Sequence, residues 1–276
     1  MIKQAIIPLA GLGTRLLPLT SVFAKELLPI NGKPGIEYIL DECIDAGIKE
    51  VIFIISQKKL MIKKYFYNDK FYRNIIKQKK DPRIISEYKK ILRYKKMIKF
   101  VFQDKPLGTG DAVLKTKKFI KNRYFLMLLP DDLIIKKNCS KSMIAIHKKF
   151  NASVMASMKV NKDEVSRWGI YDVKKKIDNK NFIIKNVIEK PSIKQAPSNN
   201  AVIGRYILPK TIFKKLSKLK PGKGKEIHIT DAIQSLINDN DKFIGHNFLG
   251  KYLDCGTMKG YINSTAEISK IWKYAW

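Results

Sequence analysis

The sequence contains few cysteines, and they do not form a recognisable metal-binding or disulfide pattern. Cys43, Cys139 and Cys255 are odd in number and widely separated, and no C-x-x-C motif occurs among the 276 residues. A zinc site or a disulfide framework needs closely or regularly spaced cysteines, so neither is indicated. We therefore expect a protein of a reducing compartment, the cytoplasm.

Long hydrophobic runs are also lacking. No run approaches the roughly 20 apolar residues that cross a bilayer. The first run, Ala5–Ala10, is too short for the core of a secretion signal, so we expect no membrane association.

No internal repeat, low-complexity linker or clean boundary divides the chain. Residues 1–276 are therefore expected to form one domain, which is long enough to bury a large core.

Acidic residues are scarce, and the 24 Asp and Glu against 55 Lys and Arg give a net charge of +31. Such an excess is typical of nucleic-acid-binding proteins. The lysines, however, are spread along the whole chain, and clusters such as Lys77–Lys80 and Lys174–Lys176 lack the interleaved aromatic residues of a base-stacking surface. Compositional drift towards lysine explains the charge better, and no specific nucleic-acid partner is expected.

The most distinctive stretch is Leu9–Pro29, which reads LAGLGTRLLPLTSVFAKELLP. The apolar run Gln4–Leu9 before it predicts a buried strand. Glycines at the end of a strand let backbone N–H groups approach a ligand closely, because no Cβ blocks the way. Arg15 and Lys25 add cationic donors that suit phosphate oxygens. The stretch therefore predicts a loop that binds a nucleoside triphosphate, although a plain glycine turn is the alternative.

Neither of two familiar phosphate-binding motifs fits this loop. The dinucleotide fingerprint GxGxxG would need glycine where Leu16 stands. A Walker A loop would need Gly-Lys-Ser/Thr at its end, but the first lysine after the glycines is Lys25. The loop must therefore belong to another class of nucleotide-binding protein.

Strand-like apolar runs alternate with segments of helical periodicity. The runs Val51–Ile55, Ile98–Gln103 and Tyr124–Leu129 have the length of buried strands, and Pro34–Ala46 places its apolar residues at helical spacing. This alternation predicts an α/β fold, Rossmann-like, with a mixed and mostly parallel central sheet flanked by helices.

Three further segments carry helical signals. The basic and aromatic segment Asn68–Lys96, interrupted by Pro82, predicts two helices that pack on the side of the sheet, with a nucleic-acid-binding arm as the alternative. Thr230 is expected to be the N-cap of a helix over Asp231–Asn238. A last helix is expected over Lys259–Tyr274.

Two acids follow directly after the predicted strand Tyr124–Leu129. Asp131 and Asp132 would stand at the carboxyl end of a parallel strand, where open α/β sheets bind ligands. Carboxylate oxygens there suit Mg²⁺ beside a triphosphate. A solvated acidic turn is the alternative from spacing alone.

Several weaker motifs lie in similar positions after strands or before helices. Gln103 precedes Gly108-Thr-Gly-Asp111 and could read the edge of a pyrimidine, although a glycine-rich helix start fits almost as well. Glu189-Lys190-Pro191 could hold a sugar hydroxyl and a phosphate, or be a surface charge pair. Asp254 lies in a turn that includes Gly256, and the formation of this turn alone would explain an aspartate there.

Taken together, GLGTRLLP and KELLP resemble the signature of the nucleotidyltransferases that join a sugar 1-phosphate to a nucleoside triphosphate. KELLP at Lys25–Pro29 is similar to the bacterial UTP–glucose-1-phosphate uridylyltransferases. The resemblance covers nearly the whole chain and is weakest over Asn68–Lys96. It implies a glycosyltransferase-A-like fold in a single domain, with a nucleotide-binding half over 1–135 and a sugar-phosphate-binding half over 136–276. The chain departs from the pattern at Ala24, where proline is common, and at Asp111, where histidine is common.

The resemblance also implies roles for individual residues. It places Arg15 on the leaving phosphates, Lys25 at the α-phosphate and Lys190 on the sugar phosphate. The remaining nucleotide contacts are expected from Ala10, Gly11, Gly13, Thr14, Glu26, Gln103 and Gly108. The hexose is expected to contact Gly169, Glu189 and Gly204. The metal ligands for Mg²⁺ are expected to be Asp131 and Asp254, with Asp132 behind them. The pocket wall is expected to include Glu226, Thr230 and Asp231.

The implied reaction is uridylyl transfer from UTP to glucose 1-phosphate. The nearest alternatives keep the fold but pair dTTP with glucose 1-phosphate or GTP with mannose 1-phosphate. An alternative of another class is a basic nucleic-acid-binding protein with a vestigial nucleotide pocket. The family pairs subunits through a further C-terminal helical stretch, so a homo-oligomer stays open for a sequence that ends at Trp276.

Overall fold

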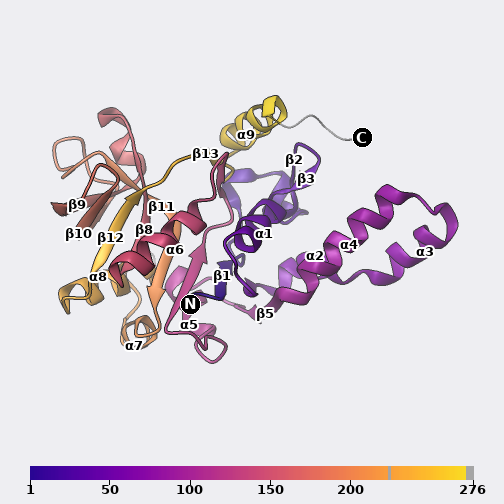
Figure 1. Ribbon diagram of the computed structural model, residues 1–276, viewed down its shortest axis with the longest axis horizontal. Helices are drawn as coiled ribbons and strands as arrows, with labels where there is room; N and C mark the ends of the chain where they lie inside the picture. The colour runs from indigo at the N-terminus through magenta and orange to yellow at the C-terminus, as the bar shows by residue number, and fades with distance from the viewer. Residues whose placement is uncertain (223–224, 272–276) are drawn as a thin grey trace.

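One nine-stranded sheet forms the centre of the molecule in the computed structural model, which describes residues 1–222 and 225–271 (Figure 1). From edge to edge, the strand order is β5 (Ile98–Phe102), β4 (Glu50–Ile55), β1 (Gln4–Pro8), β6 (Tyr124–Leu128), β11 (Asn200–Pro209), β8 (Ser153–Lys159), β12 (Phe243–Asn247), β10 (Asn181–Glu189) and β9 (Gly169–Lys176).

The sheet is mixed, as predicted, but its parallel character is confined mainly to one half. The strands β5, β4, β1 and β6, all from the first 128 residues, pair in parallel. Beyond β6 the pairings are antiparallel except for β8 with β12. The description "mostly parallel" therefore holds only for the amino-terminal half. The later strands are long and joined partly by hairpins, which apolar runs alone do not distinguish from parallel strands.

Helices cover both faces of the sheet. One layer contains α1 (Gly35–Asp45), α2 (Leu60–Tyr67), α4 (Pro82–Met97), α6 (Cys139–Phe150) and α9 (Met258–Ile271), whose buried residues join one hydrophobic cluster. The opposite layer contains α5 (Thr109–Lys115), α7 (Ile212–Leu216) and α8 (Ile229–Asn238) around a second cluster. The strand β4, second from the edge, is buried on both sides, which explains why it reads as the continuous apolar run VIFII.

The prediction that Asn68–Lys96 packs on the side of the sheet is wrong for its first half. The segment forms α3 (Asp69–Lys79) and α4, and the two helices extend away from the sheet as an arm (Figure 1). No residue of α3 is buried, and the ring of Tyr72 stacks on Tyr88 of α4 at 5.1 Å. Only the carboxyl-terminal part of α4 enters the core, through Ile91, Tyr94 and Met97. The amphipathic pattern of α3 thus serves helix-to-helix packing within the arm.

Two helix boundaries differ from the expected ones. The helix α8 begins at Ile229 with His228 as its N-cap, so Thr230 lies in the first turn and is not the cap. The last helix, α9, runs over Met258–Ile271, and the expected residues 272–274 lie outside the described ranges. None of the helices in the described ranges is long and apolar enough to cross a membrane.

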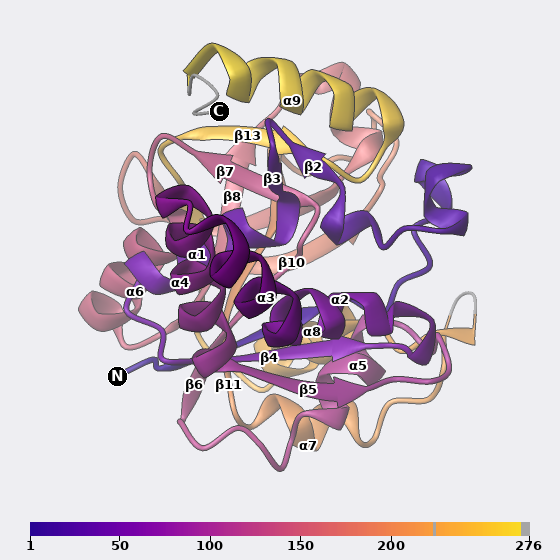
Figure 2. The ribbon, with the colours of Figure 1, turned by 90° about the vertical axis from the view of Figure 1, so that its right-hand side faces the viewer.

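Short elements complete the fold and lie beside the site. Two small sheets pair β7 (Asp132–Ile135) with β13 (Lys251–Asp254) and β2 (Pro29–Ile30) with β3 (Lys33–Pro34). Figure 2 shows α9 beside β13 and the β2–β3 hairpin. The 3₁₀ turns are η1 (Thr14–Leu16), η2 (Leu19–Ser21), η3 (Lys25–Leu27), η4 (Gln57–Lys59) and η5 (Lys162–Arg167).

Candidate active site

Four of the expected site residues meet at the carboxyl ends of β1, β6 and β13. The Nζ of Lys25 lies 2.8 Å from Oδ2 of Asp131, and a terminal nitrogen of Arg15 lies 3.4 Å from the same oxygen. A Cβ added to Gly256 would lie 2.8 Å from that oxygen and 3.2 Å from Oδ1 of Asp254. Two cations from the amino-terminal loop therefore lie against Asp131, and Asp254, 123 residues further along the chain, approaches Asp131 beside Gly256.

Backbone pairing fixes the two acids relative to each other. Asp254 stands opposite Asp132 in the β7–β13 ladder, and the N–H of Cys255 donates to the carbonyl of Asp131 at 2.8 Å. The carboxylate of Asp254 accepts from the N–H of Gly256 and from the Thr257 hydroxyl, which closes the turn. Cys255 is buried, and burial raises the pKa of its thiol to about 12. This turn is held too firmly to be an ordinary solvated loop.

The charges of this cluster stabilise one another. Burial alone would raise the pKa of Asp131, but the ammonium of Lys25 and then Arg15 hold that pKa below its usual value. Burial likewise would lower the pKa of Lys25, and the carboxylates of Asp131 and Glu26 raise it instead. Asp131 is therefore anionic and Lys25 cationic near neutral pH.

Asp132 connects the strand that follows Asp131 to β11 and β13. Its Oδ2 accepts from the N–H of Gly204 at 2.8 Å, and its Oδ1 accepts from the Tyr252 hydroxyl at 2.7 Å. A Cβ on Gly204 would lie only 2.4 Å from Oδ2 of Asp132, so no other residue fits there without displacing the carboxylate. Burial and the neighbouring Asp131 raise the pKa of Asp132. The Asp132 carboxylate is therefore engaged by Gly204 and Tyr252, and its supporting role behind Asp131 stays a prediction.

The expected sugar contacts lie next to one another on β9, β10 and β11. Gly169 and Glu189 are paired in register, and a Cβ on Gly169 would lie 3.1 Å from Oε2 of Glu189. Glu189 and Lys190 are both exposed, and Lys190 has a positive φ of 46°. The ring of Trp168 meets the ring of Tyr252 at 5.5 Å, which joins this group to the strand that carries Asp254.

The expected base-binding residues form their own cluster at the start of α5. The buried amide of Gln103 donates to the carbonyl of Gly108 at 3.1 Å and to Oδ2 of Asp111 at 2.8 Å. Gly108 has φ +94°, and a Cβ there would lie 2.6 Å from the carbonyl oxygen of Ile227. Glycine is therefore required by the packing of the α5 and α8 starts, whatever contacts the base makes. Asp111 orients Gln103.

The glycine loop itself is open to a ligand. Among the described residues, no atom lies within 4 Å of a Cβ built on Gly11, and Gly11, Thr14 and Arg15 are exposed. Gly13 has φ +70°, which glycine adopts without strain, and its carbonyl accepts from the Thr20 hydroxyl. Ala10, by contrast, is buried, so any contact that it makes would come from its backbone.

Sequence reasoning missed two residues that the structure ties to the site. Lys59 donates to both carboxylate oxygens of Glu26, at 2.8 and 2.9 Å, so the Glu26 side chain is already engaged and buried. A nucleotide contact by Glu26 would therefore have to come from its backbone. Tyr252 holds Asp132 as described above. A single lysine after a strand and a single tyrosine within one give no pattern that could have revealed either.

A larger cavity, of about 650 Å³, lies away from this cluster. Its walls come from α1, α4, β7 and the β2–β3 hairpin, and they include Glu37, Asp41, Lys90 and Lys137. It contains none of the expected site residues that the structure describes. A smaller pocket lies at the cluster itself and is bordered by Lys25, Glu26, Asp131, Cys255 and Tyr261, among others. The convergence of charged groups, and not cavity size, identifies the candidate site.

Comparison with known proteins agrees with this geometry. The "Nucleotidyl transferase" family model matches residues 4–271. A protein of Staphylococcus saprophyticus described as UTP–glucose-1-phosphate uridylyltransferase 1 is 36% identical over 269 residues, which are 97% of this chain and 93% of that protein. A crystal structure of UDP-glucose pyrophosphorylase complexed with UDP-glucose is 35% identical with a TM-score of 0.86, covering 99% of this chain and 100% of the other.

A second structural comparison gives the same result. The structure of a UTP-bound UGPase from Acinetobacter baumannii is 32% identical with a TM-score of 0.89, covering 99% of this chain and 95% of that one. The resemblance that GLGTRLLP and KELLP indicated is thereby confirmed over the full fold. The chain belongs to the nucleotidyl transferase family and, within it, to the UTP–glucose-1-phosphate uridylyltransferases.

Proposed function

We propose that the chain transfers a uridylyl group from UTP to α-D-glucose 1-phosphate and releases pyrophosphate. The observation that carries the proposal is the meeting of Arg15 and Lys25 with Asp131 and Asp254 around Gly256. The identities of 35–36% to curated relatives with this activity, over more than 90% of each relative, support the choice of substrates.

The proposed chemistry is an in-line displacement at phosphorus. An oxygen of the sugar phosphate forms a bond to the α-phosphorus of UTP as the bond to the bridging oxygen of pyrophosphate breaks. The attacking oxygen is already anionic, so no general base is needed, and catalysis consists of positioning and charge stabilisation. Arg15 would hold the leaving phosphates, Lys25 would stabilise charge at the α-phosphate, and the exposed Lys190 would bind the sugar phosphate.

The remaining proposed contacts follow the division of the site. The uracil would lie against Gln103 and Gly108, whose geometry Asp111 fixes. The triphosphate would lie on the backbone of the open loop, with contacts from Ala10, Gly11, Gly13, Thr14 and Glu26. The hexose would lie at the adjoining group formed by Gly169, Glu189 and Gly204.

A divalent metal, which this family generally uses, fits the donor set present. Asp131 and Asp254 offer carboxylate oxygens that both lie near the same side of Gly256, and the described residues contain no group of three or more His, Cys, Asp or Glu that could hold a metal ion without the substrate. Two carboxylates that share the ion with substrate phosphates are the pattern typical of Mg²⁺. Bound there, Mg²⁺ would supply charge neutralisation at the phosphates. Asp131 and Asp254 would hold it, and Asp132 would orient Asp131.

Metal removal provides a direct test. With EDTA, pyrophosphate release from UTP and glucose 1-phosphate is expected to fall to background and to return when Mg²⁺ is added. The variant Asp254→Asn is expected to need a higher Mg²⁺ concentration for half-maximal activity, because one anionic oxygen is lost. Glu164→Gln, at an acid on η5 that pairs with nearby Arg167, is the matched control. Full activity in EDTA would contradict the metal assignment.

Substrate choice is tested by crossing UTP, dTTP and GTP with glucose 1-phosphate and mannose 1-phosphate. The pair UTP and glucose 1-phosphate is expected to give the highest kcat/KM, by about tenfold or more, because a site built to hydrogen-bond one base leaves polar groups unpaired with another. Pyrophosphate release is the readout. Faster turnover with dTTP or GTP would favour one of the alternative substrate pairs.

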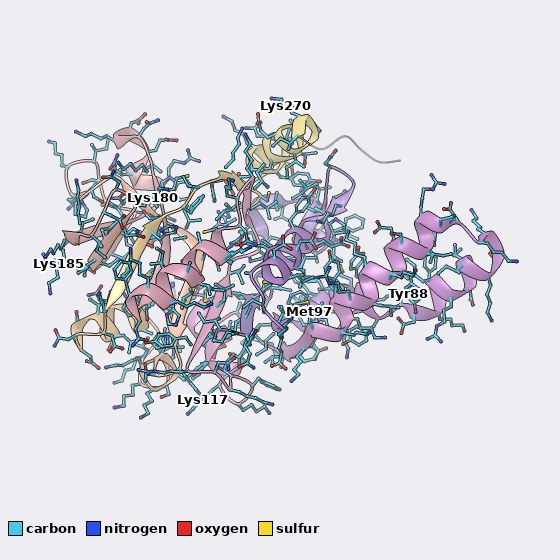
Figure 3. The ribbon with its side chains drawn as sticks, viewed as in Figure 1. Tyr88, Met97, Lys117, Lys180, Lys185 and Lys270 are labelled. Carbon is cyan, nitrogen blue, oxygen red and sulfur yellow. The ribbon has the colours of Figure 1, made fainter. Side chains whose placement is uncertain are left out.

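The remaining expectations concern partners and location. The labelled lysines Lys117, Lys185 and Lys270 lie at the lower, left-hand and upper margins of the molecule (Figure 3), which supports a dispersed charge without a specific nucleic-acid surface. The alternative, a nucleic-acid-binding protein with a vestigial pocket, requires steep salt-dependent binding without pyrophosphate release. The three cysteines, all described and buried, suit a cytoplasmic enzyme. A homo-oligomer stays a prediction.

A further inference from the structure

Lys59 and Glu26 form a buried ion pair directly behind the cationic loop. Lys59 ends η4, which follows the central strand β4, whereas Glu26 lies in η3. The Nζ of Lys59 donates to both oxygens of Glu26, and the two side chains are only 9% and 1% exposed. Taking two charges out of water is costly, so an isolated buried pair of this kind is weak evidence of a stabilising role. Its position next to Lys25 suggests a role in the reaction instead.

Glu26 is the next residue after Lys25, and the two side chains leave the same turn in different directions. Lys25 reaches Asp131, and Glu26 reaches Lys59. The small pocket of the site is bordered by Lys25, Glu26 and Asp131 together, so the turn that carries Glu26 lies at the edge of the reaction site. An unpaired carboxylate there would attract the ammonium of Lys25, because charges interact strongly where water is excluded.

We propose that Lys59 is a positioning residue for nucleotidyl transfer, because it neutralises Glu26 and so keeps the ammonium of Lys25 directed at Asp131 and the nucleotide. The inference rests on the role proposed above for Lys25. Lys59 itself does not reach the nucleotide, since its Nζ faces both oxygens of Glu26 and its side chain is almost fully enclosed. Lys59 therefore acts through its neighbours and is not a catalytic residue.

The test compares five variants in steady-state kinetics with thermal denaturation alongside. Lys59→Met is expected to lower kcat by about tenfold or more while KM for UTP changes little, because a displaced catalytic group can cost up to about a hundredfold in rate. Lys59→Arg is expected to restore most of the turnover, because it returns the positive charge. Lys58→Met, at the exposed neighbouring lysine on the same turn, is the matched control and is expected to match the wild type.

The double variant Glu26→Gln/Lys59→Met separates positioning from stability. Its kcat is expected to exceed that of Lys59→Met, because the carboxylate that competes for Lys25 has been removed together with its partner. It also guards against a single variant that fails to fold, since it leaves no buried lone charge. A Lys59→Met enzyme that loses thermal stability but keeps its kcat would overturn the inference, and so would a double variant no faster than the single one.

Lys25→Met, assayed in parallel, separates the positioning role of Lys59 from the proposed role of Lys25 itself. If Lys25→Met loses turnover and Lys59→Met does not, the positioning inference alone is overturned. If Lys25→Met keeps full turnover, the proposed arrangement of the active site fails and the inference fails with it. Loss in both single variants, with recovery in the double variant, supports the inference.

Discussion

Replacing Lys25 with methionine is expected to lower kcat for uridylyl transfer by about a hundredfold or more, the scale of losing one preorganised charge contact in the transition state. The side chain of Lys25 is 14% exposed and lies 2.8 Å from Asp131, so its charge acts where water is largely excluded. Methionine keeps the length and volume of the side chain and removes only the charge. Initial rates of pyrophosphate release over a range of UTP concentrations provide the measurement.

Arg15 provides an internal comparison for this result. Its side chain is 66% exposed and its closest nitrogen lies 3.4 Å from Asp131, so solvent screens its charge more strongly. Arg15→Met is therefore expected to have the smaller effect and to raise KM for UTP in addition. A Lys25→Met enzyme that changed only in KM would show that Lys25 binds ground state and transition state equally, contrary to its proposed role.

The amino-terminal half of the fold could be predicted from sequence because its signals are local. A fully apolar run such as β4 and the periodic apolar residues of α1 each specify their own element. The arm could not be placed in the same way. The amphipathic pattern of α3 indicates that one face is covered, but not whether a sheet or another helix covers it, and in the folded chain α4 does so. Strand direction in the second half likewise depends on distant pairings.

In the candidate site, too, residues within local motifs could be predicted, whereas residues that act through distant partners could not. Arg15, Lys25 and Asp131 belong to contiguous motifs, and their resemblance to a known signature predicted that they would be brought together. Lys59 and Tyr252 act through partners 33 and 120 residues away in the chain. No spacing rule connects such pairs, so only the folded structure shows that these two residues support the loop and Asp132.

Replacing Arg205 with methionine is expected to lower the free energy of unfolding by about 3–5 kcal/mol, because the Glu42 carboxylate would stay buried without its partner. Arg205 is completely buried on β11, and it donates to both oxygens of Glu42 and to the carbonyls of Leu129, Gly204 and Asp132. The substitution therefore removes one ion pair and several hydrogen bonds at once. Urea denaturation of the variant and the wild type provides the measurement.

A second variant shows whether the lone charge is the cause. Arg205→Met/Glu42→Met removes both charges and is expected to recover part of the loss, because apolar pairs often replace buried ion pairs at little cost. Recovery should be incomplete, since the carbonyls of Leu129 and Asp132, between β6 and β7, lose the donor that Arg205 supplies. Arg167→Met, at a pair exposed to 63% and 38%, is the surface control and should cost no more than about 1 kcal/mol. A double variant as unstable as Arg205→Met would instead attribute the loss to those carbonyls, and thus to the strand end that presents Asp131.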